Sequence, residues 1–174
     1  MMKEEIATEA KALWHMHPLR VRYQETDQMG VVFHGNYLTW FEIGRTELVR
    51  SLGLSYIEIE KAGLLLPVVD ANISYVSPAR YDDIVFICTR IEELSPIRMA
   101  FCSEIRMAEE QVALPQSQWW HEAEPPGKLL TRGGTRHVWV NRDWRPARLD
   151  KAFPAVYGRL QAAAAGVVQE EGSE

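Results

Sequence analysis

Residues 23–53 read YQETDQMGVVFHGNYLTWFEIGRTELVRSLG, in which a polar turn leads into a long helical pattern. Apolar residues recur at the i, i+3/i+4, i+7 spacing of one helix face, beginning with Tyr37 and Phe41. Further apolar residues between these positions widen the stripe beyond one narrow face. The pattern predicts a largely buried helix from Tyr37 to Leu52, which Gly53 closes as a C-cap glycine.

Outside this helix most apolar runs are short and alternate with polar residues, which is the period of two typical of β-strands. The predicted elements are a strand at Arg20 to Gln24, a short helix at Tyr56 to Lys61, strands at Val69 to Tyr75, Asp83 to Glu93, Ile97 to Met107 and Lys128 to Arg142, and a C-terminal helix from Lys151 to Ala165. One long helix followed by several strands indicates an α+β protein with an antiparallel sheet of about five strands.

The two central runs surround a turn at residues 94–96 and predict a hairpin. A register centred on residue 95 gives one mostly apolar face and brings opposite charges together. On the second face this register pairs Glu92 with Arg98, Arg90 with Ala100 and Cys88 with Cys102. Because Ile84 and Phe86 also lie on that second face, we expect another subunit to cover part of it.

The composition is that of an ordinary globular domain, with 174 residues of which 47% are hydrophobic and 25% charged. A formal net charge of −5 gives no general attraction to nucleic acid. Residues 1–12 lack the apolar run of a signal peptide, and no later segment approaches the roughly 20 apolar residues of a membrane span. A cytoplasmic location is therefore expected.

Common chemical motifs give little support to other classes of protein. The two cysteines, Cys88 and Cys102, have no CxxC spacing, so we expect reduced, packed thiols rather than a zinc site or a disulfide. The sequence contains no GxGxxG, GxxxxGK[ST] or GxSxG motif, which leaves nucleotide cradles and serine-hydrolase elbows without support.

The turn before the long helix is the place where chemistry is best supported. Asp27 lies in this turn, and the helix that follows begins with unpaired backbone N–H groups and the positive end of the helix dipole. A carbonyl group bound there would be polarised next to a carboxylate. Taken alone, an aspartate before a helix is more often a turn or cap residue than a catalytic one.

The run T-D-x-x-G-V-V-F-H-G-N-Y, followed by W-F-E-x-x-R-T-E, resembles the hotdog-fold acyl-CoA thioesterases of the 4-hydroxybenzoyl-CoA thioesterase type, including the bacterial enzymes encoded beside the Tol-Pal system. The similarity continues through residues 67–69 and 75–83 and covers about Leu19 to Pro146. It implies a hotdog fold, in which the sheet wraps around one long central helix. It also implies a reaction in which acyl-CoA and water give a carboxylic acid and CoA.

The resemblance also assigns roles to individual residues. Asp27 corresponds to the catalytic carboxylate, and the backbone amide at His34 corresponds to the group that polarises the thioester carbonyl. The implied substrate-binding residues are Tyr23, Gly30, Val32, Phe33 and Asn36. No metal or bound cofactor is implied, since CoA is part of the substrate, and the active form is expected to be a homodimer or homotetramer.

With this resemblance, the chain divides into an N-terminal extension (1–18), a hotdog thioesterase domain (19–147) and a C-terminal helix and tail (148–174). Residues 109–127 follow neither period, and they form an insertion relative to shorter relatives. We expect this insertion to adjust stability or access without carrying catalysis. Its Trp119-Trp120-His121 cluster favours a loop anchor or a subunit contact over an acyl clamp.

Several interpretations of the site residues stay open. Asp27 could activate water as a general base or attack the thioester as a nucleophile. His34 could act through its imidazole or only cap and pack, and Asn36 also suits a structural hydrogen bond. Glu42 is a second carboxylate on the helix, although Glu42 and Glu47 are better explained as partners of Arg45 and Arg50.

The residues that bind the CoA phosphates and the class of reaction also stay open. The CoA phosphates should meet basic side chains, for which Arg80, Arg90, Arg98, Arg132 and Arg136 are equal candidates. The alternative functions are a hotdog dehydratase or hydratase that acts on acyl thioesters, and a non-catalytic acyl-CoA-binding protein.

Overall fold

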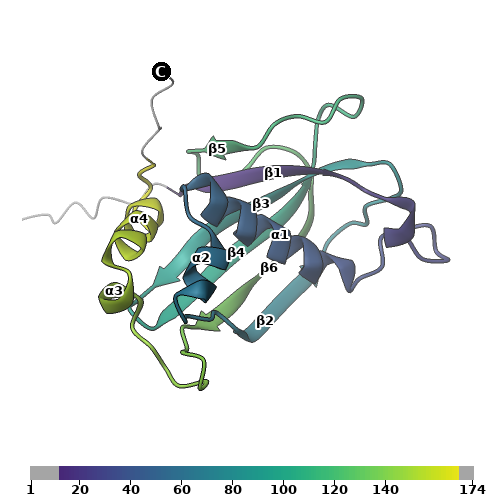
Figure 1. Ribbon diagram of the computed structural model, residues 1–174. Coiled ribbons are helices and arrows are strands. Elements are labelled where there is room, and N and C mark those ends of the chain that lie inside the picture. Colours follow the sequence, from purple (N-terminus) through teal and green to yellow (C-terminus); the bar gives the residue numbers. More distant parts are fainter. Residues whose placement is uncertain (1–11, 169–174) are drawn as a thin grey trace, which may run out of the picture.

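The computed structural model describes residues 12–168 as a curved sheet with helices packed against it (Figure 1). Its elements are β1 (Trp14–Arg20), the 3-10 turn η1 (Tyr23–Glu25), α1 (Asn36–Ser51), α2 (Tyr56–Lys61), β2 (Val68–Tyr75), β3 (Ile84–Leu94), β4 (Arg98–Met107), β5 (Gln118–Trp120), β6 (Leu129–Val138), α3 (Leu149–Ala152) and α4 (Pro154–Ala164). Among residues 12–168, no helix combines the length and apolar character that crossing a membrane requires.

The strands form one antiparallel sheet in the order β2-β6-β4-β3-β1-β5. This confirms the prediction of an α+β protein with an antiparallel sheet. The sheet has one strand more than expected, because β5 lies inside the 109–127 insertion, where three strand residues are too few to show a period of two. The last predicted strand is shorter than expected and ends at Val138.

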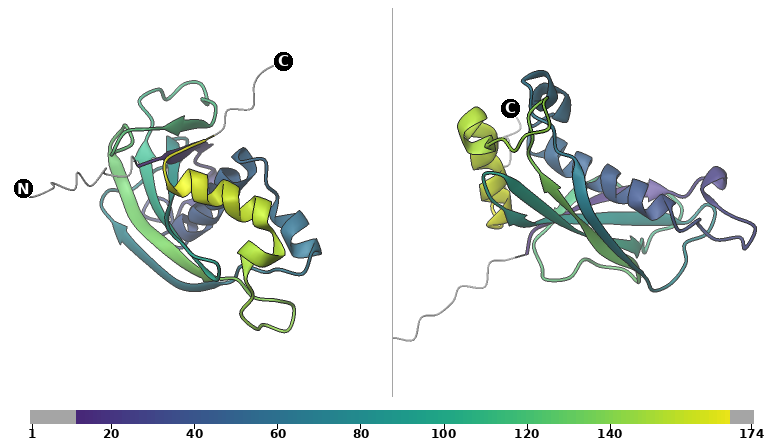
Figure 2. Two further views of the ribbon diagram at one scale, coloured as in Figure 1. Left: turned by 90° about the vertical axis from the view of Figure 1, so that its left-hand side faces the viewer. Right: turned by 90° about the horizontal axis from the view of Figure 1, so that it is seen from below.

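The long helix α1 lies along one face of the sheet (Figures 1 and 2). Its side chains Trp40 and Phe41 are buried against that face. The helix lies close against β3 at Gly44, where an added Cβ would collide with side-chain atoms of Thr89 and Ile87. A residue without a side chain is therefore required at this position for α1 to lie so close to the sheet.

The first strand is not where the sequence pattern placed it. We predicted a strand at Arg20 to Gln24, but β1 is Trp14–Arg20 and residues 23–25 form a 3-10 turn. Trp14 and Met16 alternate with His15 and His17, so a period of two is present, but it covers only four residues before Pro18. Pro18 also argued against a strand, but β5 pairs only with residues 14–16, which leaves Pro18 on an edge where proline is tolerated.

The β3–β4 hairpin has the predicted strands and a different register. Its pairs include Ile87 with Ile105, Cys88 with Glu104, and Arg90 with Cys102. Up to Ile91 the register is shifted by two residues, which leaves these side chains on their predicted faces because the period of a strand is two. The three predicted pairs on the second face, Cys88 with Cys102, Arg90 with Ala100 and Glu92 with Arg98, are therefore wrong. A bulge beside Glu92 and a turn closed by the Ser95 amide on the Arg98 carbonyl move the centre of the hairpin away from residue 95.

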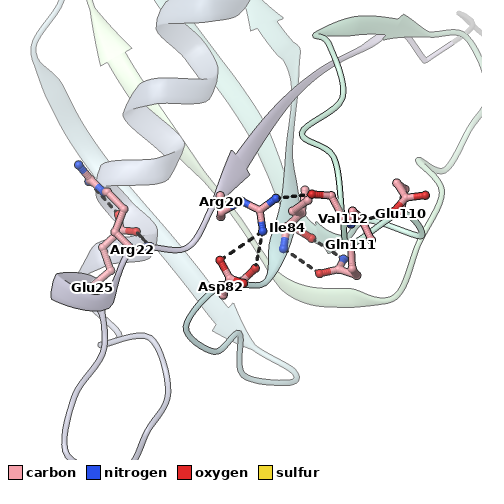
Figure 3. Close-up of polar contacts among 8 residues, drawn as sticks. All are labelled: Arg20, Arg22, Glu25, Asp82, Ile84, Glu110, Gln111 and Val112. Carbon is pink, nitrogen blue, oxygen red and sulfur yellow. Dashed lines mark hydrogen bonds and ion pairs between the residues drawn. The ribbon is translucent and has the colours of Figure 1, made fainter.

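On the sheet face turned away from α1, the part formed by β1 and β3 is covered by the insertion of the same chain. The buried cluster on this face consists of Trp14, Met16, Ile84, Phe86, Cys88 and Ala108. The Trp14 indole donates a hydrogen bond to the Ala123 carbonyl oxygen at 3.2 Å. The side chain of Gln111 bonds to both backbone groups of Ile84 (Figure 3). The insertion therefore removes the reason, based on Ile84 and Phe86, to expect a second subunit on this part of the sheet. Both cysteines are free thiols, as predicted.

The predicted C-terminal helix is divided into α3 and α4. Pro154 has no amide hydrogen and disfavours a helical residue before it, and Phe153 has φ −141° and ψ 73°. α4 lies at the C-terminal end of α1, where the Arg159 guanidinium donates to the Leu52 carbonyl oxygen at 3.1 Å. The domain limits at residues 18 and 147 stay a prediction, although β1 crosses residue 18. Residues 1–11 of the predicted extension and 169–174 of the predicted tail lie outside the described residues.

Candidate active site

The turn between β1 and α1 is held by its own backbone. The Asp27 carbonyl accepts a hydrogen bond from the Gly30 amide, and the Val31 carbonyl accepts one from the Asp27 amide, both at 2.9 Å. Gly30 has a φ of 72°, in the left-handed region that favours glycine. Asp27 Oδ1 accepts from the Met29 amide at 2.8 Å. The half-buried carboxylate is thereby oriented through one oxygen, and within residues 12–168 no hydrogen bond occupies Oδ2.

His34 lies between this turn and α1. Its carbonyl oxygen accepts a hydrogen bond from the Tyr75 hydroxyl, at the end of β2, over 2.9 Å. Its imidazole is exposed and lies against the Phe33 ring, with the ring centroids 4.3 Å apart. In the described part of the chain, no acceptor takes up the His34 amide hydrogen. That amide can therefore donate to a ligand oxygen near the start of α1.

A cavity of about 240 Å³ brings Asp27 and His34 to one site. Its other walls are formed by Met29, Val31 and Val32 of the turn, by Tyr37 of α1 and by residues 75–78 at and after the end of β2. Most of these side chains are apolar. A mostly apolar cavity with one carboxylate and one available amide suits an apolar group that carries a carbonyl.

A buried glutamate fixes the turn to α1. Glu25 accepts a hydrogen bond from the Trp40 indole at 2.9 Å. It also accepts from the Arg22 amide at 2.8 Å and pairs with the Arg22 guanidinium at 3.0 Å (Figure 3). Burial acts to raise the pKa of Glu25, but the bonds from Arg22 and Trp40 outweigh it and lower the pKa below its ordinary value. The Glu25 carbonyl accepts from the Asn36 side chain at 2.8 Å. This ionised network holds the turn in place beneath the cavity.

The predicted site residues are only partly brought together. Asp27, His34 and Val32 line the cavity, and Gly30 shapes its turn. The remaining three lie outside the lining: Tyr23 is exposed against the Tyr81 ring, Phe33 is exposed, and Asn36 is hydrogen-bonded to Glu25. Asn36 thus makes the structural bond that its type suggested, and the part of these three in substrate binding stays a prediction.

Sequence reasoning missed the walls that come from distant parts of the chain. Tyr37 contributes from α1, where its hydroxyl accepts from the Ala79 amide at 3.1 Å. Tyr75 and residues 76–78 contribute from the end of β2. Residues 75–78 belong to the stretch that carries the family resemblance, which is the signal that could have pointed to them.

The other candidate residues have structural roles. Arg45 pairs with Glu42 at 3.9 Å, and Arg50 pairs with Glu47, as expected. Neither glutamate lines the cavity at Asp27.

The two tryptophans of the insertion also lie away from this cavity. Trp119 packs on His15 with ring centroids 5.0 Å apart, and Trp120 donates to the Glu124 carbonyl oxygen at 2.8 Å. These contacts agree with a loop anchor.

Known proteins resemble this chain over the region of the site. The sequence profile of the Thioesterase superfamily matches residues 29–113. A candidate acyl-CoA thioesterase of Bacillus subtilis (strain 168), YneP, is 37% identical over 137 residues, which are 78% of this chain and 87% of that protein. The acyl-CoA thioester hydrolase YbgC of Escherichia coli O6:H1 is 34% identical over 92 residues, which are 53% of this chain and 69% of that protein.

The likeness extends to the three-dimensional structure. The DHNA-CoA thioesterase from Staphylococcus aureus has a TM-score of 0.71 and 34% sequence identity to this chain, covering 86% of this chain and 91% of that one. This likeness confirms the predicted hotdog fold. Since relatives above 30% identity are matched over most of their length and share this fold, the chain belongs to the Thioesterase superfamily and is a thioester hydrolase.

Proposed function

We propose that the protein hydrolyses acyl-CoA thioesters in the cavity between the Asp27 turn and the end of β2. The observation that carries this proposal is the presence of one carboxylate, Asp27, and one available backbone amide, His34, in a mostly apolar cavity. A thioester carbonyl fits between the two groups with its oxygen at the amide. The activities named for YneP and YbgC support acyl-CoA as the substrate class.

In the proposed reaction the His34 amide stabilises the oxyanion that forms at the carbonyl oxygen. It lies near the N-terminal end of α1, whose dipole acts in the same direction. Loss of one such donor costs roughly 3 kcal/mol in comparable sites. The group is a backbone amide, so the His34 side chain can vary without removing it.

Asp27 supplies the second half of the reaction by one of two routes. It takes a proton from the attacking water, or it attacks the carbonyl carbon to form a mixed anhydride that water then opens. In both routes the C–S bond breaks, CoA leaves as a thiolate that takes up a proton, and the acyl group becomes a carboxylic acid. No metal or bound cofactor takes part in this proposal.

We place the CoA phosphates beside Arg80. Its guanidinium donates to the Gly30 carbonyl oxygen at 3.4 Å, and the side chain is exposed next to the Asp27 turn. Two of the other candidates are engaged elsewhere, since Arg90 stacks on the Trp14 ring and Arg136 pairs with Glu93.

We further propose a homodimer in which a second copy covers β2. This strand lies at the edge of the sheet, and Val68, Val69 and Tyr75 are 49%, 59% and 50% exposed. An exposed apolar edge strand is usually paired or covered. The partner would then lie beside Tyr75 and the cavity. Light scattering should give a dimer or tetramer, and a monomer at micromolar concentration would contradict this arrangement.

A thiol-release assay tests the function. Short-chain, long-chain and aromatic acyl-CoAs are incubated with the protein, and free CoA is measured with a chromogenic disulfide against a blank without substrate. We expect release well above the spontaneous rate for at least one class. Saturable binding with no release would favour a non-catalytic binding protein. Loss of enoyl-CoA absorbance without thiol release would favour a hydratase.

A further inference from the structure

A second cavity, of about 120 Å³, lies between α1, α2 and the residues that follow β6. Its walls include Arg45 of α1, Tyr56 of α2 and Trp139, together with Leu64 and Leu66. None of its lining residues lines the cavity at Asp27. It is therefore a separate site with a different chemical character.

Two hydrogen-bond donors in this wall have no protein partner. The Trp139 side chain is 1% exposed, and within residues 12–168 no group accepts a hydrogen bond from its indole Nε1. The Tyr56 hydroxyl is shielded from solvent and likewise has no partner in that range. A buried donor without an acceptor costs about 1–3 kcal/mol. Both atoms are shielded from water, so a small rotation of each side chain toward the cavity would bring its donor to a ligand that accepts hydrogen bonds.

Arg45 adds a positive charge that is only weakly neutralised. Its side chain is 13% exposed, whereas the side chain of its partner Glu42 is 69% exposed and 3.9 Å away, which is beyond hydrogen-bond distance. The guanidinium lies over the Tyr56 ring, 5.7 Å from the centroid. Burial lowers the pKa of the nearby His137 to about 4, and the Arg45 charge acts in the same direction. The interior around Arg45 therefore carries positive charge.

These groups select the ligand by chemistry and by size. A guanidinium and an indole N–H donate and cannot accept, and a carboxylate matches the guanidinium fork with two oxygens. The volume of about 120 Å³ admits a carboxylate on a short stem. Glu42 and Glu60 also line the cavity, but both are exposed, where water and salt screen their repulsion.

A neighbouring cavity offers a way in. It has a volume of about 230 Å³, shares Glu42 and Arg45 with the first, and is lined on its other side by the apolar Leu38, Val68 and Ala71. A carboxylate can therefore reach Arg45 either free in solution or at the end of an apolar chain that lies between α1 and β2.

We propose that Arg45, Tyr56 and Trp139 form a carboxylate-binding site. The carboxylate is that of a short free acid or the terminal carboxylate of an acyl group, and the second source rests on the acyl-CoA hydrolysis proposed above.

The binding test uses the indole N–H of Trp139 as the reporter. The Trp139→Phe variant identifies its signal among those of the six tryptophans in a ¹H–¹⁵N spectrum. Titration of the full chain with succinate should shift this signal saturably, whereas chloride at equal ionic strength should not. Arg45→Met should abolish the saturable shift. Arg50→Met, the same change at an exposed position of the same helix, should retain it.

Tyr56→Phe keeps the fold and charge and removes one donor, so it should weaken succinate binding several-fold. An unsaturable shift in the unmodified protein, or equal shifts in the Arg45→Met and Arg50→Met variants, would overturn the site.

A kinetic comparison separates the two sources. Sebacoyl-CoA and decanoyl-CoA have chains of equal length and differ by the terminal carboxylate; a ten-carbon chain is used because Arg45 lies about 12 Å along α1 from Tyr37 of the Asp27 cavity. If the acyl group supplies the carboxylate, kcat/KM should favour sebacoyl-CoA, and Arg45→Met should reduce that preference at least tenfold. A saturable succinate shift with no such preference assigns the site to free acids. If neither ester is hydrolysed, the titration still decides the site, and only the proposed function fails.

Discussion

The hydroxyl of Tyr75 donates a hydrogen bond to the carbonyl oxygen of His34 over 2.9 Å. This bond ties the end of β2 to the segment just before α1, across 41 positions of the chain. It therefore links the edge strand, where we place the partner copy, to the residue whose amide we place at the thioester carbonyl.

Tyr75→Phe should slow turnover by removing that one bond. The phenyl ring can keep its contact with Tyr37, whose centroid is 5.5 Å away, so little else changes. A hydrogen bond contributes about 0.5–1.5 kcal/mol, so kcat should fall roughly two- to twelvefold. The free energy of unfolding, measured in urea, should change by less than about 1 kcal/mol because Tyr75 is half exposed. An unchanged kcat would mean that this bond does not position His34.

Gly44→Ala should destabilise the fold. The added methyl group would meet Thr89 and Ile87, and overpacking typically costs about 1–3 kcal/mol, against a gain in helix propensity of up to about 1 kcal/mol. Gly158→Ala in α4 is the matched control, because nothing lies within 4 Å of the added Cβ, and it should be stabilising. Urea denaturation checks both signs. Equal effects of the two variants would show that α1 does not lie as close to β3 as described.

Stability should fall as the pH decreases from 6.5 toward 4. Burial, aided by His17, lowers the pKa of His15 from 6.5 to about 4, and burial lowers that of His137 to about 4. In this window the unfolded chain binds protons that the folded chain does not. Each histidine therefore lowers the free energy of unfolding by up to roughly 1.4 kcal/mol for each pH unit of acidification. Above pH 6.5 both histidines are neutral in the folded and unfolded chains, and this loss of stability is absent.

A variant isolates the contribution of His15. His15→Leu removes one of the two buried histidines, and within residues 12–168 the Nδ1 atom of His15 has no hydrogen-bond partner to lose. Urea denaturation between pH 4.5 and 7 should therefore show a shallower slope for the variant. An identical slope would mean that His15 titrates alike in the folded and unfolded chains.

Replacing residues 109–127 with a short Gly-containing turn should weaken the fold and spare the chemistry. Met16 and Cys88, both 0% exposed, would lose cover, and Cys88 should then react with a disulfide reagent. In the intact protein burial raises the pKa of the Cys88 thiol and keeps it inert. Turnover should stay measurable, since no residue of the segment lines the Asp27 cavity. Complete loss of turnover in a folded, assembled variant would place the insertion in the active site.

The sequence could predict the elements whose periodicity is strong. α1 begins and ends within one residue of the prediction, because a stripe at helical spacing has only one consistent interpretation. The hairpin faces were correct up to Ile91 and their register was wrong, since a shift of two residues preserves these faces. β1 was misplaced because its alternation covers only Trp14 to His17 and then meets Pro18, a residue that disfavours a strand.

The candidate site could be predicted only where it is local in sequence. Asp27, Val32 and His34 belong to one turn that the family motif covers. Tyr37, and Tyr75 with residues 76–78, reach the cavity through the pairing of β2 and the position of α1, which one sequence does not encode in any short pattern. The same limit applies to Trp139, which meets Arg45 and Tyr56 only in the folded chain.

The central claim is that the Asp27 carboxylate carries the reaction, and Asp27→Asn tests it most directly. Asparagine retains the shape of the side chain and an oxygen that can accept from the Met29 amide, but it is neither a base nor a nucleophile. Turnover should fall at least ~100-fold, the lower end of general acid–base contributions, while a non-hydrolysable CoA thioether binds almost as tightly as before. Glu42→Gln is the matched change at the second carboxylate, and its turnover should stay close to that of the unmodified enzyme. Near-normal turnover by Asp27→Asn would contradict the account and make Glu42 the next carboxylate to test.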